Sequence, residues 1–318
     1  MADKDLGIAM WGASGSGKST LLAALFMGLA HGDGWKIAGS DEKATNYLIK
    51  MTTLLEGARS FPPPTRQTEH YRWTLIGPEG RHRSGWRRWL RPRYAPRIPL
   101  EVIDAPGDHF LDPDQDTDPE AHKELIDRLV DSRGIIFLYD PVRELTNGDS
   151  FMGLYAPLLQ LTQRMITDPG LARRCKDGKL PHHVAICITK LDDQRVLRTA
   201  ERIDVLDTDP DDDLEIPQVG GERAKELFQS LQQVSPGAAN LVLKLLESHF
   251  HEDRVEFFAT SSIGFYVDPA KGFDRHDFVN VLPVEDVSPD KRIRIRGQVR
   301  PINVIEPVIW LGQRMAAR

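Results

Sequence analysis

The stretch Gly12-Ala13-Ser14-Gly15-Ser16-Gly17-Lys18-Ser19-Thr20 decides the fold of this chain. It fits the pattern G-x-x-x-x-G-K-[ST] at every fixed position. The apolar run at residues 6–11 predicts a buried strand before it, and residues 21–26 predict a helix after it. A strand, a glycine-rich turn and a helix in this order are typical of a loop that binds nucleotide phosphates.

The residue types in this loop suit phosphate chemistry. Glycine permits the tight turn that points successive backbone N–H groups at phosphate oxygens. The pattern places the Lys18 ammonium on the β- and γ-phosphates and the Ser19 hydroxyl on a Mg²⁺ ion. A glycine-rich turn without a ligand is the alternative. The remaining predicted nucleotide contacts are Gly12, Ser14, Gly15, Ser16, Gly17 and Thr20.

Composition narrows the class of protein. The chain has 318 residues, of which 40% are hydrophobic, enough for the core of an α/β domain with large insertions. A net charge of −6 argues against a general nucleic-acid binder. The two cysteines, Cys175 and Cys187, lack metal-ligand spacing and suit a reducing cytosol. The beginning of the chain has no apolar signal region, and the longest apolar run, residues 21–30, is too short for a bilayer. We therefore expect a cytoplasmic protein without a transmembrane segment.

Apolar runs and helical patterns alternate along the chain, which predicts a mostly parallel sheet with right-handed crossovers. The expected fold class is an α/β three-layer sandwich of the P-loop NTPase type, with helices on both faces of the sheet. Further strands are predicted at residues 70–76, 98–104, 134–139, 183–188, 255–259 and 292–296. Further helices are predicted at residues 120–130, 154–167, 221–234, 238–249 and 304–316, the last capped by Asn303.

We expect one domain over residues 1–318 that carries insertions. These are a helix at about 40–57, an arginine-rich hairpin at 78–97, an acidic and helical insertion at 193–253, and an extension at 265–300 before the final helix. The acidic run at 207–215 predicts a disordered or solvated loop. A metal site there is the weaker alternative, because the run lacks a glycine turn of the calcium-binding kind.

The arginine-rich segment, residues 81–97, has two open interpretations. It holds seven arginines and no acidic residue, with Trp86, Trp89 and Tyr94 interleaved. A solvated basic loop explains it simply. The alternative is a contact surface for an anionic partner such as nucleic acid, a lipid headgroup or an acidic protein. The acidic run of this chain, or of a second copy in a homodimer, is one such partner.

Three later motifs follow predicted strands. Asp104-Ala105-Pro106-Gly107 follows the strand at 98–104, Thr189-Lys190-Leu191-Asp192 follows that at 183–188, and Thr260-Ser261-Ser262 follows that at 255–259. A carboxylate such as that of Asp192 can accept hydrogen bonds from both N1–H and the 2-amino group of guanine. Adenine lacks this arrangement and would leave the carboxylate unsatisfied. A transporter-type ATPase would carry a glutamate directly after the strand aspartate and an L-S-G-G-Q signature, and the sequence has neither.

In this order, the motifs resemble the D-x-x-G, [NT]-K-x-D and S-A elements of P-loop GTPases. The chain resembles the TRAFAC class, meaning the Ras-like and translation-factor-related G domains, from about residue 6 to 262 with the closing helix. The resemblance implies that Asp104 holds Mg²⁺ through a water and that the Gly107 N–H senses the γ-phosphate. It also implies that Thr189, Lys190 and Asp192 bind guanine, with Ser261 and Ser262 near its 6-oxo group.

The loop before the second strand supplies the switch threonine of this resemblance. Thr65 is the predicted residue, with its hydroxyl in the Mg²⁺ shell, because the prolines at 62–64 hold the backbone extended before it. Thr68 is the alternative. The run Phe61-Pro62-Pro63-Pro64-Thr65 is similar to bacterial GTPase domains found in multi-gene signalling or conflict systems.

The resemblance implies an enzyme that hydrolyses GTP to GDP and phosphate and acts as a Mg²⁺-dependent switch for a protein effector or activator. Hydrolysis is expected to be slow without an activator, because Asp108 and His109 after Gly107 offer no assignable water-orienting residue. Ser14 stands where glycine is common in Ras-like members, so a partner's arginine is expected to approach differently. Two alternatives stay open: an ATP-dependent enzyme such as a kinase or ATPase, and a nucleotide-regulated module that binds anionic surfaces.

Overall fold

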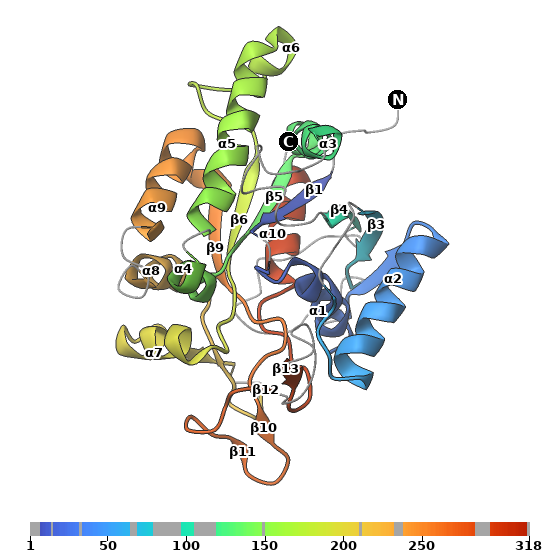
Figure 1. Cartoon of the computed structure of the whole chain (residues 1–318), viewed down its shortest axis with the longest axis vertical. Helices are drawn as coiled ribbons and strands as arrows, with labels where there is room; N and C mark the ends of the chain where they lie inside the picture. Colours follow the sequence, from blue (N-terminus) through green and yellow to red (C-terminus); the bar gives the residue numbers. More distant parts are fainter. Residues whose placement is uncertain are drawn as a thin grey trace.

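Four parallel strands form the centre of the fold, in the order β1-β5-β6-β9 (Figure 1). We describe it from a computed structural model, which covers residues 7–13, 15–31, 34–63, 69–78, 97–104, 119–147, 150–209, 212–231, 238–283 and 293–316. Nearly every residue of the first three strands is buried, as expected where helices cover both faces of a parallel sheet. The strands are β1 (Ile8–Gly12), β5 (Gly134–Tyr139), β6 (His183–Ile188) and β9 (Val255–Ala259).

A three-stranded antiparallel sheet continues this layer on the β1 side. Its order is β2-β3-β4, and β4 lies next to β1. Its strands are β2 (Lys36–Gly39), β3 (Glu69–Ile76) and β4 (Arg97–Asp104).

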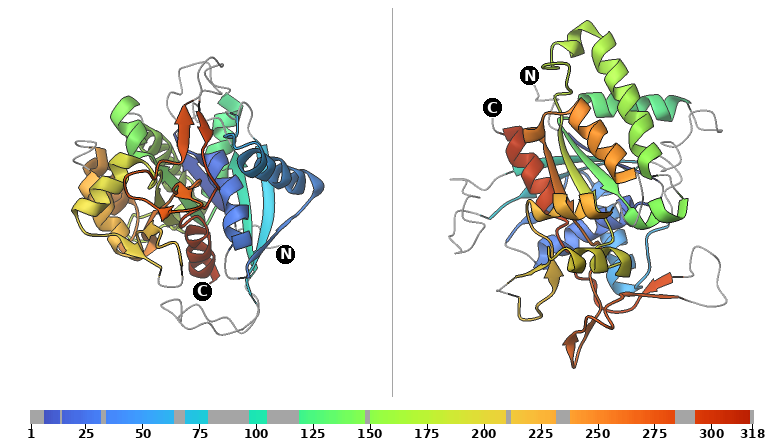
Figure 2. Two further views of the ribbon diagram at one scale, coloured as in Figure 1. Left: turned by 90° about the horizontal axis from the view of Figure 1, so that it is seen from below. Right: turned by 90° about the vertical axis from the view of Figure 1, so that its left-hand side faces the viewer.

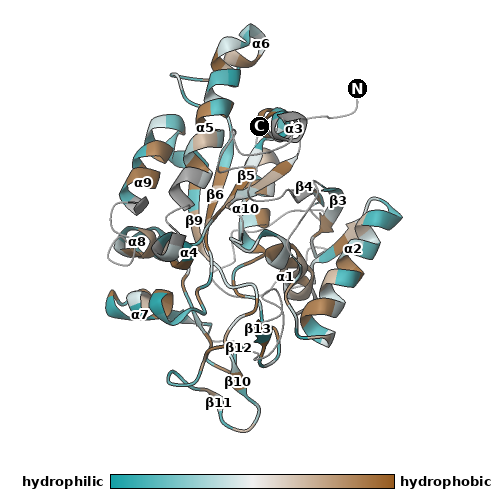
Figure 3. Ribbon diagram, viewed as in Figure 1, coloured by the Kyte–Doolittle hydropathy of each residue, from teal (hydrophilic) through white to brown (hydrophobic). Residues whose placement is uncertain are grey.

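Side chains of successive sheet residues enter two different hydrophobic clusters, one on each face. In β5, Ile135 and Phe137 pack with one group of helices, while Ile136 and Leu138 pack with the other. Figures 1 and 3 show the hydrophobic strands between these helical layers. On one face lie α3 (Pro119–Asp131), α5 (Ser150–Thr167), α7 (Gln194–Arg202), α8 (Arg223–Ser230) and α9 (Ala238–His249); on the other lie α1 (Lys18–His31), α2 (Glu42–Thr52) and α10 (Glu306–Ala316). The predicted fold class, a three-layer α/β sandwich with a mostly parallel central sheet, is confirmed.

The helix α2 lies within the range 40–57 that the sequence predicts to be helical. Asp41 caps it, because its carboxylate accepts the Ala44 N–H at 2.7 Å, and the helix continues into a π-helical segment, Thr53–Gly57. An aromatic stack fastens α2 to β3: the rings of Tyr47 and Tyr71 are 4.0 Å apart and those of Tyr71 and Trp73 are 5.4 Å apart. Figure 2 shows α2 alongside this antiparallel sheet.

The described residues of the acidic run at 207–215 are exposed or partly exposed, and part of the run also has regular structure. Its first part is β7 (Asp207–Thr208), which pairs with β8 (Pro217–Gln218). Asp207 forms an ion pair with Arg223 at 2.6 Å, and the Asp212 carboxylate accepts a backbone N–H at 3.1 Å. Carboxylates engaged in turns and ion pairs order the chain, which charge content alone does not reveal. Within the described residues, no cluster of three or more acidic, histidine or cysteine side chains could hold a metal ion.

The extension before the final helix forms two small hairpins below the carboxyl ends of the central strands (Figure 1). A buried side chain, that of Asn280, holds it together. Its amide donates to the carbonyls of Ile263 at 3.1 Å and Gln298 at 3.3 Å, and it accepts the Gly297 N–H at 2.8 Å. The hairpin strands are β10 (Val267–Asp268), β11 (Gly272–Phe273), β12 (Val281–Pro283) and β13 (Ile293–Ile295).

The predicted cap of the final helix is wrong. The final helix begins at Glu306, and Asn303 does not cap it. Asn303 instead has a left-handed φ of 50° and donates its amide to the carbonyls of Val219 at 2.9 Å and Ala259 at 3.0 Å.

The arginine-rich segment lies outside the described residues except for Arg97. Among the described helices, none is both long and apolar enough to cross a membrane. Three α-helices of the described residues had no predicted counterpart, namely α4 (Pro141–Asn147), α6 (Pro169–Ala172) and α7.

The close contact between Gly264 and the extension yields a stability prediction. Gly264 has a φ of +67°, and a Cβ there would lie 2.0 Å from the Arg300 carbonyl oxygen. We expect Gly264→Ala to lower the free energy of unfolding by at least about 3 kcal/mol, because strain and a backbone clash add together. Gly178→Ala is the matched control. Its φ is +74° with no atom within 4 Å, so it should cost only about 1–2 kcal/mol. Urea unfolding of the two variants measures the difference, and equal losses would contradict the clash.

Candidate nucleotide-binding site

The phosphate loop joins β1 to α1 in the predicted place. Gly15 and Gly17 have φ angles of 71° and 96°, which favour glycine. At Gly12 the need is space, since a Cβ would lie 2.7 Å from the Ser16 hydroxyl and 3.0 Å from the Leu138 carbonyl oxygen. The glycines of the motif therefore serve two purposes: the turn itself and its close packing against β5.

The side chains of Lys18 and Ser16 in the phosphate loop are buried. Lys18 is 7% exposed, and its ammonium donates to the carbonyls of Gly12 at 2.8 Å and Ala13 at 3.0 Å. The Ser16 hydroxyl is buried without a hydrogen-bond partner among the described residues. Ser19 and Thr20 lie in the first turn of α1, so the positive end of this helix faces the loop. Ser14 lies outside the described residues.

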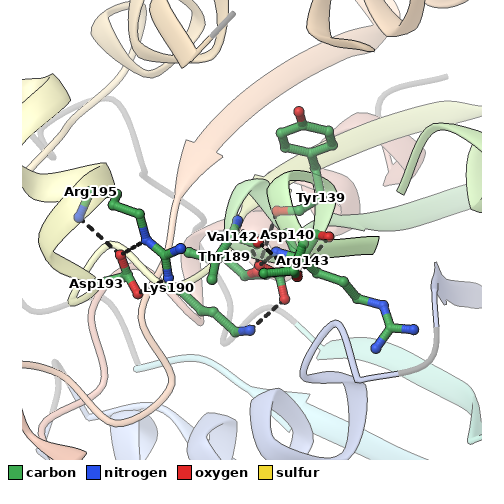
Figure 4. Close-up of polar contacts among 9 residues, drawn as sticks. Tyr139, Asp140, Val142, Arg143, Thr189, Lys190, Asp193 and Arg195 are labelled. Carbon is green, nitrogen blue, oxygen red and sulfur yellow. Dashed lines mark hydrogen bonds and ion pairs between the residues drawn. The ribbon is translucent and has the colours of Figure 1, made fainter. Parts of the chain in front are cut away.

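A buried carboxylate, Asp140, follows β5 and organises the loops beside the phosphate loop (Figure 4). Its Oδ1 accepts the backbone N–H groups of Val142 and Arg143, each at 3.0 Å, and so begins α4. Its Oδ2 lies 2.5 Å from the Lys190 ammonium. Lys190 has a left-handed φ of 60°, and this ion pair holds its side chain at the carboxyl edge of the sheet. Sequence reasoning missed Asp140; an aspartate directly after a buried strand was the available signal.

Thr189 joins the loop after β6 to the end of β5. Its hydroxyl donates to the Tyr139 carbonyl at 3.2 Å and its N–H to the same oxygen at 2.9 Å. The loop after β6 also meets the loop after β9, because the Leu191 N–H donates to the Thr260 carbonyl at 3.1 Å. Three strand ends are thus bound together.

The side chains of Asp192 and Ser261 meet between these loops. The Ser261 hydroxyl donates to Asp192 Oδ1 at 2.5 Å and accepts the Gly264 N–H at 2.8 Å. Asp192 is 8% exposed, and burial raises its pKa to about 6, although the hydrogen bond from Ser261 and the charge of Lys190 oppose the shift. Ser262 follows directly. The neighbouring Asp193 differs, since it caps α7 and forms an ion pair with Arg195.

The structure brings the phosphate loop, Thr189–Asp192 and Ser261–Ser262 to one edge of the sheet. Asp104 ends β4, opposite Glu69 in register, and its backbone is described. Thr65, Thr68 and Gly107 lie outside the described residues. The geometry therefore contains the phosphate loop, apart from Ser14, and the buried carboxylate of Asp192, which the Ser261 hydroxyl orients.

No family model matches this chain, and no curated protein matches it. Solved structures with a similar fold include a chain of the signal recognition particle receptor SRb-GTP/SRX complex from Chaetomium thermophilum. It is 14% identical over 83% of this chain and 93% of that chain, with a TM-score of 0.38. The S. cerevisiae Ski7 GTPase-like domain bound to GTP is 14% identical, with 98% of this chain and 50% of that chain covered and a TM-score of 0.40. Sup35 complexed with GDP is 11% identical, with 81% and 37% covered and a TM-score of 0.28. At these identities and TM-scores, the likeness says nothing of ligand or activity.

The buried carboxylate of Asp192 predicts a pH-dependent loss of stability. Its pKa rises from 3.8 to about 6 on folding, so the folded protein binds this proton more tightly than the unfolded chain. Stability from this group is present below pH 3.8 and is lost as pH rises through about 6. We therefore expect Asp192→Asn to exceed the wild type in free energy of unfolding by up to about 3 kcal/mol at pH 7, and by little at pH 4. Urea unfolding from pH 4 to 7.5 measures both, and a pH-independent difference would argue against the buried charge.

Proposed function

We propose that this protein binds GTP and hydrolyses it to GDP and phosphate. The observation that carries the proposal is the buried pair of Asp192 and Ser261, which lies at the same sheet edge as the phosphate loop. The Ser261 hydroxyl occupies one lone pair of Oδ1 and orients the carboxylate. The remaining lone pairs can accept the N1–H and 2-amino group of guanine.

This arrangement disfavours adenine. Adenine has no N1–H, so it would bury the Asp192 carboxylate without this partner for the lone pairs that Ser261 leaves open. The aliphatic stem of Lys190 would lie along the base, since its ammonium is fixed by Asp140. Thr189 and Ser262 complete the proposed base site. Guanine specificity separates this function from that of an ATP-dependent enzyme.

The phosphate chain would lie along the loop. The backbone N–H groups at Gly15, Ser16 and Gly17, together with the Lys18 ammonium, would balance its charge. Oxygen ligands of the kind that Mg²⁺ prefers are available from Ser19, from Asp104 and from the predicted Thr65. When bound, Mg²⁺ would neutralise charge on the β- and γ-phosphates. Gly107 would contact the γ-phosphate through its N–H.

A switch role fits the connections of the segment that leads to Thr65. The Ile295 N–H donates to the Arg59 carbonyl at 2.8 Å, and Ser60 forms a β-bridge with Arg294. The same extension holds the base-site loop, where the Arg300 N–H donates to the Ile263 carbonyl at 3.1 Å. A protein effector that contacts this extension could therefore respond to the γ-phosphate through Thr65.

We also propose that residues 1–318 form a single G domain with insertions. The two clusters that cover the sheet contain residues from α2, α8 and the extension as well as from the central strands. Both cysteines are free thiols, as suits the reducing cytosol in which we propose that the protein acts.

Nucleotide specificity tests the proposal. Asp192→Asn replaces an acceptor with a donor, so GTP affinity should fall by about 10- to 100-fold, as for the loss of a hydrogen bond to a charged group. Affinity for xanthosine triphosphate should rise, because its 2-oxo group accepts the new donor. Titration with both nucleotides measures the ratio, which an ordinary loop would leave unaltered.

Two controls accompany this titration. Asp193→Asn should leave the ratio unchanged, since Asp193 serves α7 and not the proposed base site. Lys18→Ala should weaken both nucleotides alike and abolish turnover, because it removes charge at the phosphates. Wild-type protein that binds ATP as tightly as GTP would overturn the function.

The arginine-rich segment is proposed as a docking surface for an anionic partner, either a separate molecule or the acidic run of a second copy. Arginine pairs bidentately with phosphate and carboxylate. Changing Arg83, Arg87, Arg88 and Arg91 to Ser should abolish salt-sensitive binding to anionic vesicles or acidic protein and leave GTP turnover unchanged. Collapse of turnover would assign the segment to the nucleotide site instead.

A further inference from the structure

Arg143 brings a guanidinium to the phosphate loop from a different part of the chain. It is the third residue of α4, after β5, and its side chain is half-buried. A Cβ on Gly15 would lie 2.8 Å from Arg143 Nη1 and 3.8 Å from Cζ, so the guanidinium packs directly against the loop. The missing side chain at Gly15 therefore makes room for Arg143 as well as permitting the turn.

The position of Arg143 is set from its backbone. Its N–H donates to Asp140 Oδ1 at 3.0 Å, while the other oxygen of the same carboxylate pairs with Lys190. Figure 4 shows the Arg143 side chain extending away from those of Lys190 and Asp193. One buried carboxylate thus directs two cations to two places: Lys190 toward the proposed base site and Arg143 toward the phosphate loop.

The location suits contact with phosphate oxygens. The backbone N–H groups around Gly15 belong to the stretch that surrounds the phosphate chain in loops of this type. A guanidinium in contact with this stretch is within reach of the same oxygens, and its planar fork can pair with two of them.

We propose, on the basis of the proposed GTPase function, that Arg143 contacts the phosphates of bound GTP and stabilises the charge that develops during hydrolysis. Water attacks the γ-phosphorus, and the bond from this atom to the β–γ bridging oxygen breaks. That oxygen and its electron pair stay on GDP, and the proton from water leaves with inorganic phosphate or to solvent. Arg143 balances negative charge at the bridging oxygen, as an arginine does when supplied within the same chain.

A merely structural role for Arg143 makes a different prediction. If the guanidinium only braced the phosphate loop, its loss would weaken GDP binding, GTP binding and thermal stability together. If it acts on the transferring phosphate, GDP affinity should stay within about threefold of the wild type while the single-turnover rate falls about 100- to 1,000-fold, the range for loss of one preorganised donor.

The experiment compares the full chain as wild type, Arg143→Ala, Arg143→Gln and Arg164→Ala. Arg164 is the matched control, since it is an arginine on α5 that pairs with Asp127 at 3.2 Å, away from the phosphate loop. GDP affinity is measured with and without aluminium fluoride, which mimics the transferring phosphoryl group. We expect wild type and Arg164→Ala to gain affinity with aluminium fluoride, and both Arg143 variants to lose this gain.

The outcomes separate this inference from the proposed function. Wild-type protein without guanine-nucleotide binding would overturn the function itself. Wild type that binds GDP and hydrolyses GTP, with Arg143 variants that keep the rate and the aluminium fluoride response, would overturn the role of Arg143 alone. Arg143→Gln preserves most of the packing, so it covers the case in which Arg143→Ala does not fold. Parallel losses of GDP affinity and melting temperature in both variants would assign Arg143 to bracing.

Discussion

The candidate site depends on the ion pair between the buried Asp140 carboxylate and the Lys190 ammonium, whose side chain is 40% exposed. Taking a carboxylate out of water is costly, and a single ion pair seldom repays that cost. Here two backbone N–H groups and the Lys190 ammonium all bond to the Asp140 carboxylate. The presence of this ion pair therefore does not indicate that it stabilises the fold. Its consequence is geometric, because it joins the loop after β5 to the loop after β6.

Asp192, in the neighbouring loop, is a second buried carboxylate whose burial costs stability. Its raised pKa shows that the folded protein would accommodate a neutral side chain more easily there. A buried carboxylate that lowers stability near neutral pH is difficult to explain by packing, whereas a ligand that donates two hydrogen bonds would offset its cost. Asp193, one residue later, is part of a helix cap and an exposed ion pair. Adjacent residues of one type thus have different physical roles, which burial distinguishes.

The central strands and the phosphate loop could be predicted from the sequence because their signals are local. A continuous apolar run such as Gly134–Tyr139 indicates a strand buried on both faces. The short strand Lys36–Gly39 alternates exposed and half-buried residues over only four positions, too few for a period to show. The prediction that Asn303 caps the final helix was wrong because asparagine favours both helix caps and left-handed backbone. Which of the two it adopts depends on hydrogen-bond partners far along the chain.

The site was predictable only where a motif spans consecutive residues. Asp140 and Arg143 belong to no such motif, and their relation to Gly15 and Lys190 arises from the parallel pairing of β1, β5 and β6. Thr65, Thr68 and Gly107 remain predictions, as does the side-chain role of Asp104. The spacing of residues in the sequence reveals those that act from one loop. Residues that come together from the ends of several strands can be recognised only when the order of the strands in the sheet is known.

The extension adds a constraint that the minimal fold does not need. It holds the loop after β9 through Asn280, and through β13 it holds the chain before Thr65. The proposed base-site loop and the segment leading to the predicted switch threonine therefore both bond to the extension. A movement of either loop must either break these backbone hydrogen bonds or carry the extension with it. The extension therefore connects the proposed base-site loop to the segment that leads to the predicted Thr65.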